Sequence, residues 1–170
     1  MAKKKYTSVA EVAQAVGMNK YALRLLKYLD QYHPNKVLDY EFIMQRADMA
    51  AAAAESYVRT NGTSPAHQIA ASEAANEVLM AGLESSKFDI VFSIADSILY
   101  EAGLGLEYDE TKEIVLRVLP KFESIFAKYP IDDPDFTAEV EYDEMIEKLT
   151  KKAKTVLQPE IEKEKEKLPF

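Results

Sequence analysis

The chain has 170 residues, of which 48% are apolar and 29% are charged, a composition typical of a globular protein. The absence of cysteine excludes disulfides, a thiolate nucleophile and a cysteine-ligated zinc site. The lysine-rich start lacks the apolar core of a secretory signal, and the longest apolar run, Met49 to Ala54, is too short to span a membrane. We therefore expect a cytoplasmic protein that does not contact a membrane.

The net charge of −8 is distributed unevenly along the chain. Residues 1–28 contain six lysines or arginines and one acid, a charge of +5, so the remaining residues carry −13. Because an acidic surface repels the phosphate backbone, any nucleic-acid contact has to come from the basic N-terminal segment.

Apolar residues recur at helical spacing along the chain, and no stretch alternates apolar and polar residues as a strand does. Glycines follow the apolar segments, where helices end, and prolines lie in first turns or just past helix ends. The first four predicted helices are residues 8–16, 19–32, 39–60 and 64–81. Ser86 and Asp89 open a fifth, and Asp109 begins a sixth, which Pro120 kinks or splits. The seventh is residues 141–157. This pattern predicts an all-α fold, a compact single-domain bundle of about six to eight helices.

The same pattern divides the chain into three regions. Residues 1–18 are expected to form a basic extension with a short helix, residues 19–158 the all-helical domain, and residues 159–170 a charged C-terminal tail. The tail alternates in charge around one apolar residue, Ile161, which predicts a frayed helix on the surface.

Small residues are concentrated on the third and fourth predicted helices. They are Ala47, Ala50, Ala51, Ala53 and Ala54, followed by Ala70, Ala71, Ala74 and Ala75. A turn at Asn61-Gly62 would fold the two helices into an antiparallel hairpin, in which small side chains allow close approach of the backbones.

The segment from Ser8 to Leu29 has the spacing of a helix-turn-helix, with Ala13 before the turn and Gly17 in it. Apolar residues at Val12, Val16, Met18, Leu23 and Leu26 are predicted to lock the two helices together. In a DNA-binding protein, Asn19, Lys20 and Arg24 would face base edges, and Lys27 with Lys3, Lys4 and Lys5 would meet phosphates. The alternative is a capped helix hairpin, because residues 21–32 are so rich in apolar side chains that they predict a largely buried helix with a narrow polar face.

The sequence predicts no metal site, cofactor or enzymatic activity. His33 and His67 are isolated, with no second ligand three or four residues away, and no nucleophile or phosphate-binding motif occurs. Carboxylates remain as the one class of catalytic group, for example among Glu73, Glu77 and Asp96.

An acidic segment extends from Asp132 to Glu147 and contains eight carboxylates and no basic residue. It lacks the glycine that an EF-hand loop requires after its acidic positions. A solvated loop is the favoured interpretation, and the alternative is a docking patch for a basic partner formed by Asp132, Asp133, Asp135 and Glu139.

Five segments resemble one known family: LRLLKYLDQYHP (23–34), FIMQRADMAA (42–51), ANEVLMAGLESSKFD (75–89), LPKFESIFAKYP (119–130) and EYDEMIEKLT (141–150). In order they cover most of residues 20–158, and they resemble the domain of unknown function 1896 family of Bacteroides-type bacteria. The resemblance implies an all-helical intracellular domain, in bacteria where mobile elements are common, with no assigned activity and no catalytic residue to transfer. It begins within the second predicted helix, which makes the first helix an extension.

The sequence therefore predicts a non-enzymatic interaction or regulatory module that binds a protein partner, as a monomer or homodimer. The alternative is a DNA-binding protein that uses the segment from Ser8 to Leu29.

Overall fold

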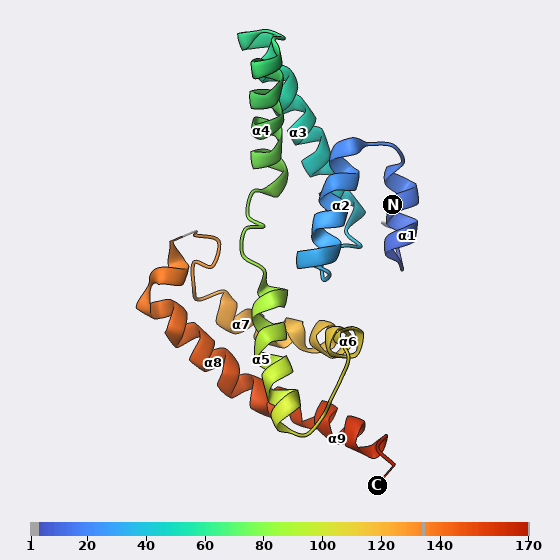
Figure 1. The fold of residues 1–170 in the computed structure, drawn as a ribbon, viewed down its shortest axis with the longest axis vertical. Coiled ribbons are helices and arrows are strands. Elements are labelled where there is room, and N and C mark those ends of the chain that lie inside the picture. The colour runs from blue at the N-terminus through green and yellow to red at the C-terminus, as the bar shows by residue number, and fades with distance from the viewer. Residues whose placement is uncertain (1–3, 134, 170) are drawn as a thin grey trace. The chain divides into compact units, whose positions relative to one another are not determined.

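The structure is a computed structural model that describes residues 4–133 and 135–169. The predicted all-α class is confirmed, since these residues form helices, turns and loops and no strand. The elements are α1 (Val9–Val16), α2 (Lys20–Tyr32), α3 (Tyr40–Asn61), α4 (Pro65–Met80), α5 (Lys87–Glu101), α6 (Tyr108–Val118), the 3-10 turn η1 (Leu119–Phe122), α7 (Glu123–Phe126), the 3-10 turn η2 (Phe136–Ala138), α8 (Val140–Val156) and α9 (Gln158–Glu166) (Figure 1).

The predicted helix starts are confirmed by their capping hydrogen bonds. The side chains of Ser8, Asn19, Asp39, Ser64 and Ser86 each accept a hydrogen bond from the backbone N–H three residues further on. At the first of these caps, the Glu11 carboxylate accepts bonds from the backbone and hydroxyl of Thr7. The capping residue is thus readable from the sequence at these five starts, whereas α6 and α8 begin one residue earlier than predicted, at Tyr108 and Val140.

The residues of the chain pack into two compact units, residues 1–84 and 85–170, and each unit has its own apolar core. In the first unit, helices α1 to α4 enclose one core, which includes Val12, Val16, Leu25, Leu29, Ile43 and Leu79. In the second, helices α5 to α9 enclose another, which includes Phe88, Leu99, Phe122, Phe126, Met145 and Leu149.

Helix α2 buries one stripe, formed by Ala22, Leu25, Leu26 and Leu29 at spacings of three and four residues. The prediction that residues 21–32 are largely buried is wrong, because Leu23, Arg24, Lys27 and Tyr32 are among the residues exposed on its other face. The physical reason is that α1 and α3 cover one side of the helix, and four small or medium apolar side chains fill that contact.

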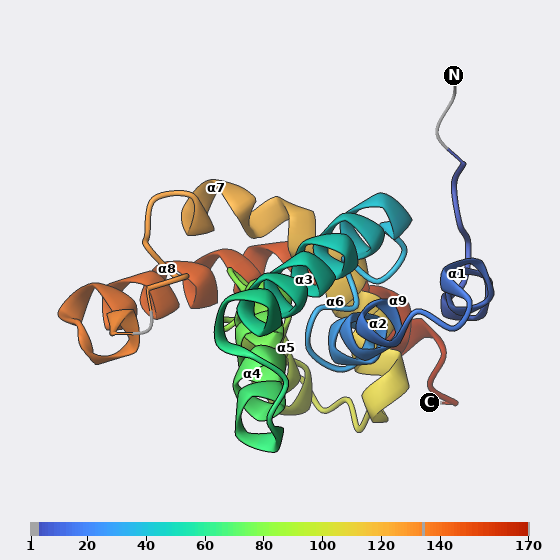
Figure 2. The same cartoon turned by 90° about the horizontal axis from the view of Figure 1, so that it is seen from above.

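Helices α3 and α4 lie side by side as an antiparallel hairpin, as predicted (Figure 2). Gly62 closes the turn with φ +106°, and its N–H donates to the carbonyl of Val58 at 2.8 Å. The alanines at the contact are Ala47 and Ala50 on α3 and Ala71 and Ala75 on α4, all 4% exposed or less. Ala51, which was expected in the contact, is exposed.

The C-terminal end of α4 is held by side chains from two other helices. The guanidinium of Arg46 on α3 donates to the carbonyls of Val78 at 3.1 Å and Ala81 at 2.6 Å. The Tyr28 hydroxyl donates to the Leu83 carbonyl at 3.0 Å. The Arg46 guanidinium thus satisfies carbonyl groups that a helix leaves without intrahelical partners at its end, and the Tyr28 hydroxyl holds the loop that follows.

In the second unit, Pro120 splits the predicted sixth helix into α6, the turn η1 and α7. Helix α8 buries Met145, Leu149 and Ala153 against α5, α7 and η1, and α7 lies beside α8 (Figure 2).

The expectation of a frayed surface helix after residue 158 is wrong. Helix α9 places Ile161 in the core of the second unit at 6% exposure, and Glu160 beside it is buried as well. The Arg117 guanidinium donates to the Glu160 carboxylate at 2.9 Å, which compensates the buried charge.

Within the part of the chain that the structure describes, no helix is both long enough and apolar enough to cross a membrane.

Candidate functional site

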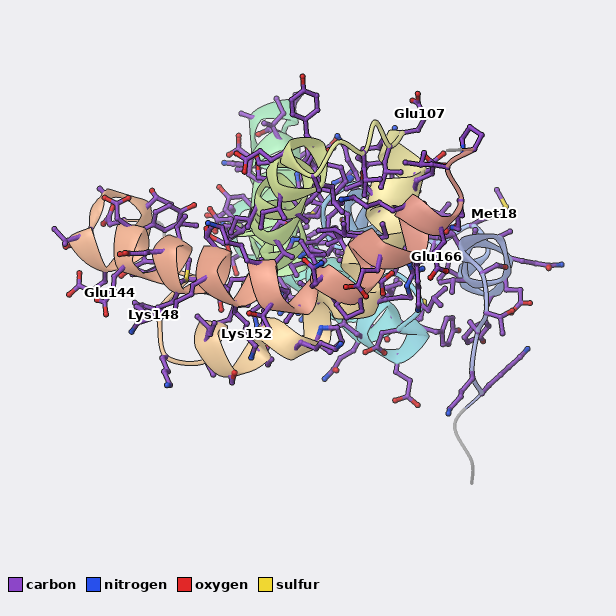
Figure 3. All side chains as sticks on the ribbon, turned by 90° about the horizontal axis from the view of Figure 1, so that it is seen from below. Met18, Glu107, Glu144, Lys148, Lys152 and Glu166 are labelled. Atoms are coloured by element: carbon purple, nitrogen blue, oxygen red, sulfur yellow. The ribbon has the colours of Figure 1, made fainter. Side chains whose placement is uncertain are left out.

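The turn between α1 and α2 differs from the predicted helix-turn-helix at two positions. Val12, Val16 and Leu26 are buried as expected, but Met18 is 98% exposed and Leu23 39% exposed. Met18 projects from the turn into solvent (Figure 3). The prediction that these two side chains lock the helices together is wrong, because Met18 lies in the exposed turn and the buried stripe of α2 passes through Ala22, Leu25, Leu26 and Leu29, which leaves Leu23 outside it.

The residues proposed to read DNA mostly have partners within the first unit. The side-chain oxygen Oδ1 of Asn19 accepts the Ala22 N–H at 3.1 Å, so it caps α2. The Arg24 guanidinium donates to the side chain of Asn76 on α4. The ammonium of Lys20 lies 4.9 Å from the centre of the Tyr21 ring, and Lys27 is exposed.

The N-terminal lysines divide between described and undescribed residues. Lys3 lies outside the described residues. Lys4 and Lys5 are exposed, and the ammonium of Lys4 lies 5.2 Å from the centre of the Tyr6 ring.

The two histidines have structural contacts within the first unit. His33 is 3% exposed, and its Nε2 lies 2.9 Å from the Leu83 carbonyl oxygen. The His67 ring is half-buried against Tyr57, with the ring centres 6.4 Å apart. Across residues 4–133 and 135–169, no three His, Asp or Glu side chains are grouped in a way that would hold a metal ion.

The four residues of the proposed acidic patch are all exposed in the second unit. Asp132 and Asp133 follow α7, and Asp135 and Glu139 flank the turn η2. The Asp133 carboxylate accepts the Asp135 N–H at 3.0 Å, so the backbone there is fixed by a local hydrogen bond.

A groove of about 710 Å³ lies between α5 and α8, next to this acidic segment. It is lined by Asp89, Ile90, Ser93, Ile94, Ser97, Ile98 and Glu101 from α5 and by Tyr142, Asp143, Ile146, Thr150 and Lys154 from α8. The two helices are in contact and converge toward their C-terminal ends (Figure 1).

The helical repeat explains which residues line the groove. On α5, Ile90, Ile94 and Ile98 follow one another at spacings of four and form a continuous apolar stripe. On α8, Tyr142 and Ile146 continue the apolar surface, and Thr150 turns its hydroxyl to the Ile146 carbonyl at 2.7 Å. The Ser97 hydroxyl likewise donates to the Ser93 carbonyl at 3.2 Å. The floor of the groove is therefore mainly apolar, and two of the hydroxyls that line it, those of Ser97 and Thr150, are bonded to their own helices.

The edges of the groove are charged. Asp89, Glu101 and Asp143 are exposed acids on its rim, and Lys154 is the one base among the lining residues. The groove was not predicted from the sequence, although α5 carries a signal for it. The helix has isoleucines at 90, 94 and 98 in addition to the buried stripe of Phe88, Val91, Ala95 and Leu99, which is a wider apolar surface than one core contact requires.

Comparison with known proteins adds a family and a related structure. No match was found among curated proteins. The chain is similar to the crystal structure of protein PG0816 from Porphyromonas gingivalis, with 27% sequence identity and a TM-score of 0.66 over 85% of this chain and 92% of that chain.

The sequence profile of one family matches residues 14–161. The match starts in the last turn of α1, six residues before the start expected from the sequence, so the turn with Gly17 and the whole of α2 lie within the family region. The resemblance noted in the sequence is confirmed, and the chain belongs to the domain of unknown function family DUF1896.

Proposed function

We propose that the protein is a non-enzymatic interaction module that binds a protein partner in the groove between α5 and α8. The observation that supports this proposal is the stripe of Ile90, Ile94 and Ile98, which forms one wall of an open groove. These side chains are half-buried, so a partner would remove further apolar area from water, which is the main favourable term in protein association.

The composition of the groove favours binding over catalysis. Its carboxylates, Asp89, Glu101 and Asp143, are exposed on the rim, whereas catalytic acids usually lie in sites that exclude water. Lys154 is the one base among the residues that line the groove, and it lies at the end opposite Asp89 and Asp143.

The shape of the groove fits a helix of the partner. Two helices with apolar residues at spacings of four present a trough into which a third amphipathic helix packs. From Asp89 to Glu101 the wall of α5 spans about 18 Å, which corresponds to about three turns of a bound helix.

The test is to isolate partners from the native cell with the tagged protein and then measure binding of the purified partner to groove variants. Ser97→Trp would fill the groove from an exposed position without removing any core side chain. Ser72→Trp, at an exposed position of α4, is the matched control. We expect binding to the Ser97→Trp protein to fall by about tenfold or more, the loss typical of an interface hot spot, and binding to the control to stay unchanged. A partner that binds both variants equally would contradict the proposal.

A further inference from the structure

We propose that the partner segment in the groove is a basic amphipathic helix, with its basic end over Asp89 and Asp143. This inference rests on the proposed function and names the chemistry of the partner. Three features support it: the charge of the second unit, the position of the acids around the groove, and the lysines that pair with other acids of the unit.

The whole net charge of the protein lies in the second unit. Residues 85–170 contain 20 acids and 12 bases, a charge of −8, whereas residues 1–84 contain nine of each. Nucleic acids and anionic lipid surfaces are repelled by such a surface, which leaves a basic protein segment as the complementary macromolecule.

The acids are concentrated at one end of the groove. Glu139, Asp143 and Glu147 follow one another at spacings of four, so they lie along one side of the first turns of α8. Asp143 lines the groove itself, and Asp89 faces it from the start of α5. The apolar floor therefore meets acidic side chains at this end of the groove, those of Asp89 and Asp143.

Other acids in the second unit are already compensated. Glu144 is paired with Lys148 at 2.9 Å, on an edge of α8 where Glu144, Lys148 and Lys152 follow one another (Figure 3). Glu123 is paired with Lys87 at 2.9 Å. Neither Asp143 nor Glu147 has such a partner among the described residues, so a basic partner gains their attraction without displacing an internal ion pair.

The opposite end of the groove has a different charge. There Lys154 and Glu101 line the groove together, so this end carries one base and one acid. A bound helix thus has its bases concentrated over Asp89 and Asp143, and its apolar stripe lies on Ile90, Ile94 and Ile98.

Three fluorescein-labelled synthetic peptides of sixteen residues test this inference on the full chain by fluorescence anisotropy. One is an amphipathic helix of leucine and lysine, the second replaces each lysine by glutamate, and the third scrambles the first so that it has no apolar face. We expect the basic amphipathic peptide to bind about tenfold more tightly than either of the others, and its affinity to fall as salt is raised.

Charge-removing variants locate the bound peptide. Glu139→Gln, Asp143→Asn and Glu147→Gln combined should weaken binding of the basic peptide by about tenfold. Ser97→Trp should abolish binding. A matched set on α6 and α9, Glu113→Gln, Glu162→Gln and Glu166→Gln, removes the same charge from exposed positions and should leave the affinity within about twofold of the unsubstituted chain.

Each other outcome overturns the inference in a distinct way. Equal binding of the glutamate or scrambled peptide would overturn the basic chemistry and leave the groove as a binding site. Basic-peptide binding that survives Ser97→Trp would place the peptide elsewhere. Binding by none of the peptides would overturn this inference, while the proposed function is judged separately with the purified native partner. A dimer in sedimentation equilibrium that Ser97→Trp dissociates would show that a second copy occupies the groove.

Discussion

Arg117 on α6 and Glu160 on α9 are joined by an ion pair of 2.9 Å, although 43 residues separate them in the chain. Hydrogen bonding from Arg117 lowers the pKa of the Glu160 carboxyl below its ordinary value of 4.5. The pair therefore ties the last helix to the core of the second unit by a contact whose strength depends on pH.

The first prediction concerns acid stability. Because the pKa of Glu160 is lower in the folded chain, the unfolded chain binds more protons as pH falls below 4.5. The stability that this group contributes is therefore present above pH 4.5. It is lost as pH falls through the pKa of Glu160 in the folded chain. Glu160→Gln should therefore flatten the decrease in the free energy of unfolding below pH 4.5, measured by urea denaturation. Glu162→Gln, an exposed neighbour on α9, should retain the original decrease. Identical pH profiles for both variants would contradict this role of the pair.

The second prediction concerns the position of α9 in the core. Ile161→Ala should lower the free energy of unfolding by about 2–5 kcal/mol, because it removes a side chain that is 6% exposed. Leu168→Ala, at a residue that is 49% exposed, should change it by less than about 0.5 kcal/mol. Similar small effects at both positions would indicate that the segment is a surface tail, as the sequence suggested.

The third prediction concerns the close packing of α3 and α4. Ala75 is fully buried in this contact, so Ala75→Leu should destabilise the protein by about 1–3 kcal/mol through overpacking. Ala52→Leu, at an exposed position of α3, should leave the thermal midpoint nearly unchanged. If Ala75→Leu is tolerated as well as its control, the two backbones are not in close contact there.

These cases show which parts of the fold are readable from sequence. Capping residues and prolines act through their own backbone, so Ser86 and Pro120 predicted the start of α5 and the split after α6 correctly. Burial depends on what lies opposite a residue. Met18 and Ile161 are two positions where the predicted burial was wrong for this reason. The Met18 side chain is 98% exposed, and the Ile161 side chain is part of a core. The groove was missed for the same reason, because it exists only where α5 and α8 meet.

The fourth prediction concerns DNA. We expect no retardation of mixed genomic DNA in a gel-shift assay at low salt, because the three residues proposed to face base edges already have partners. Asn19 caps α2, Arg24 is bonded to Asn76, and the Lys20 ammonium lies over the Tyr21 ring. Retardation that is abolished by Lys20→Glu with Lys27→Glu, at unchanged helix content in circular dichroism, would establish the helix-turn-helix interpretation instead.

The central claim, that the groove between α5 and α8 binds a helix, is tested most directly by a dye placed inside it. The chain has no cysteine, so Ser97→Cys provides a single labelling site in the groove, and Ser72→Cys provides one on α4. An environment-sensitive dye at position 97 should shift its emission to shorter wavelength and saturate as the basic amphipathic peptide is added, because the helix covers it with apolar side chains. The dye at position 72 should not respond. Saturable peptide binding by anisotropy with no emission change at position 97 would contradict the claim.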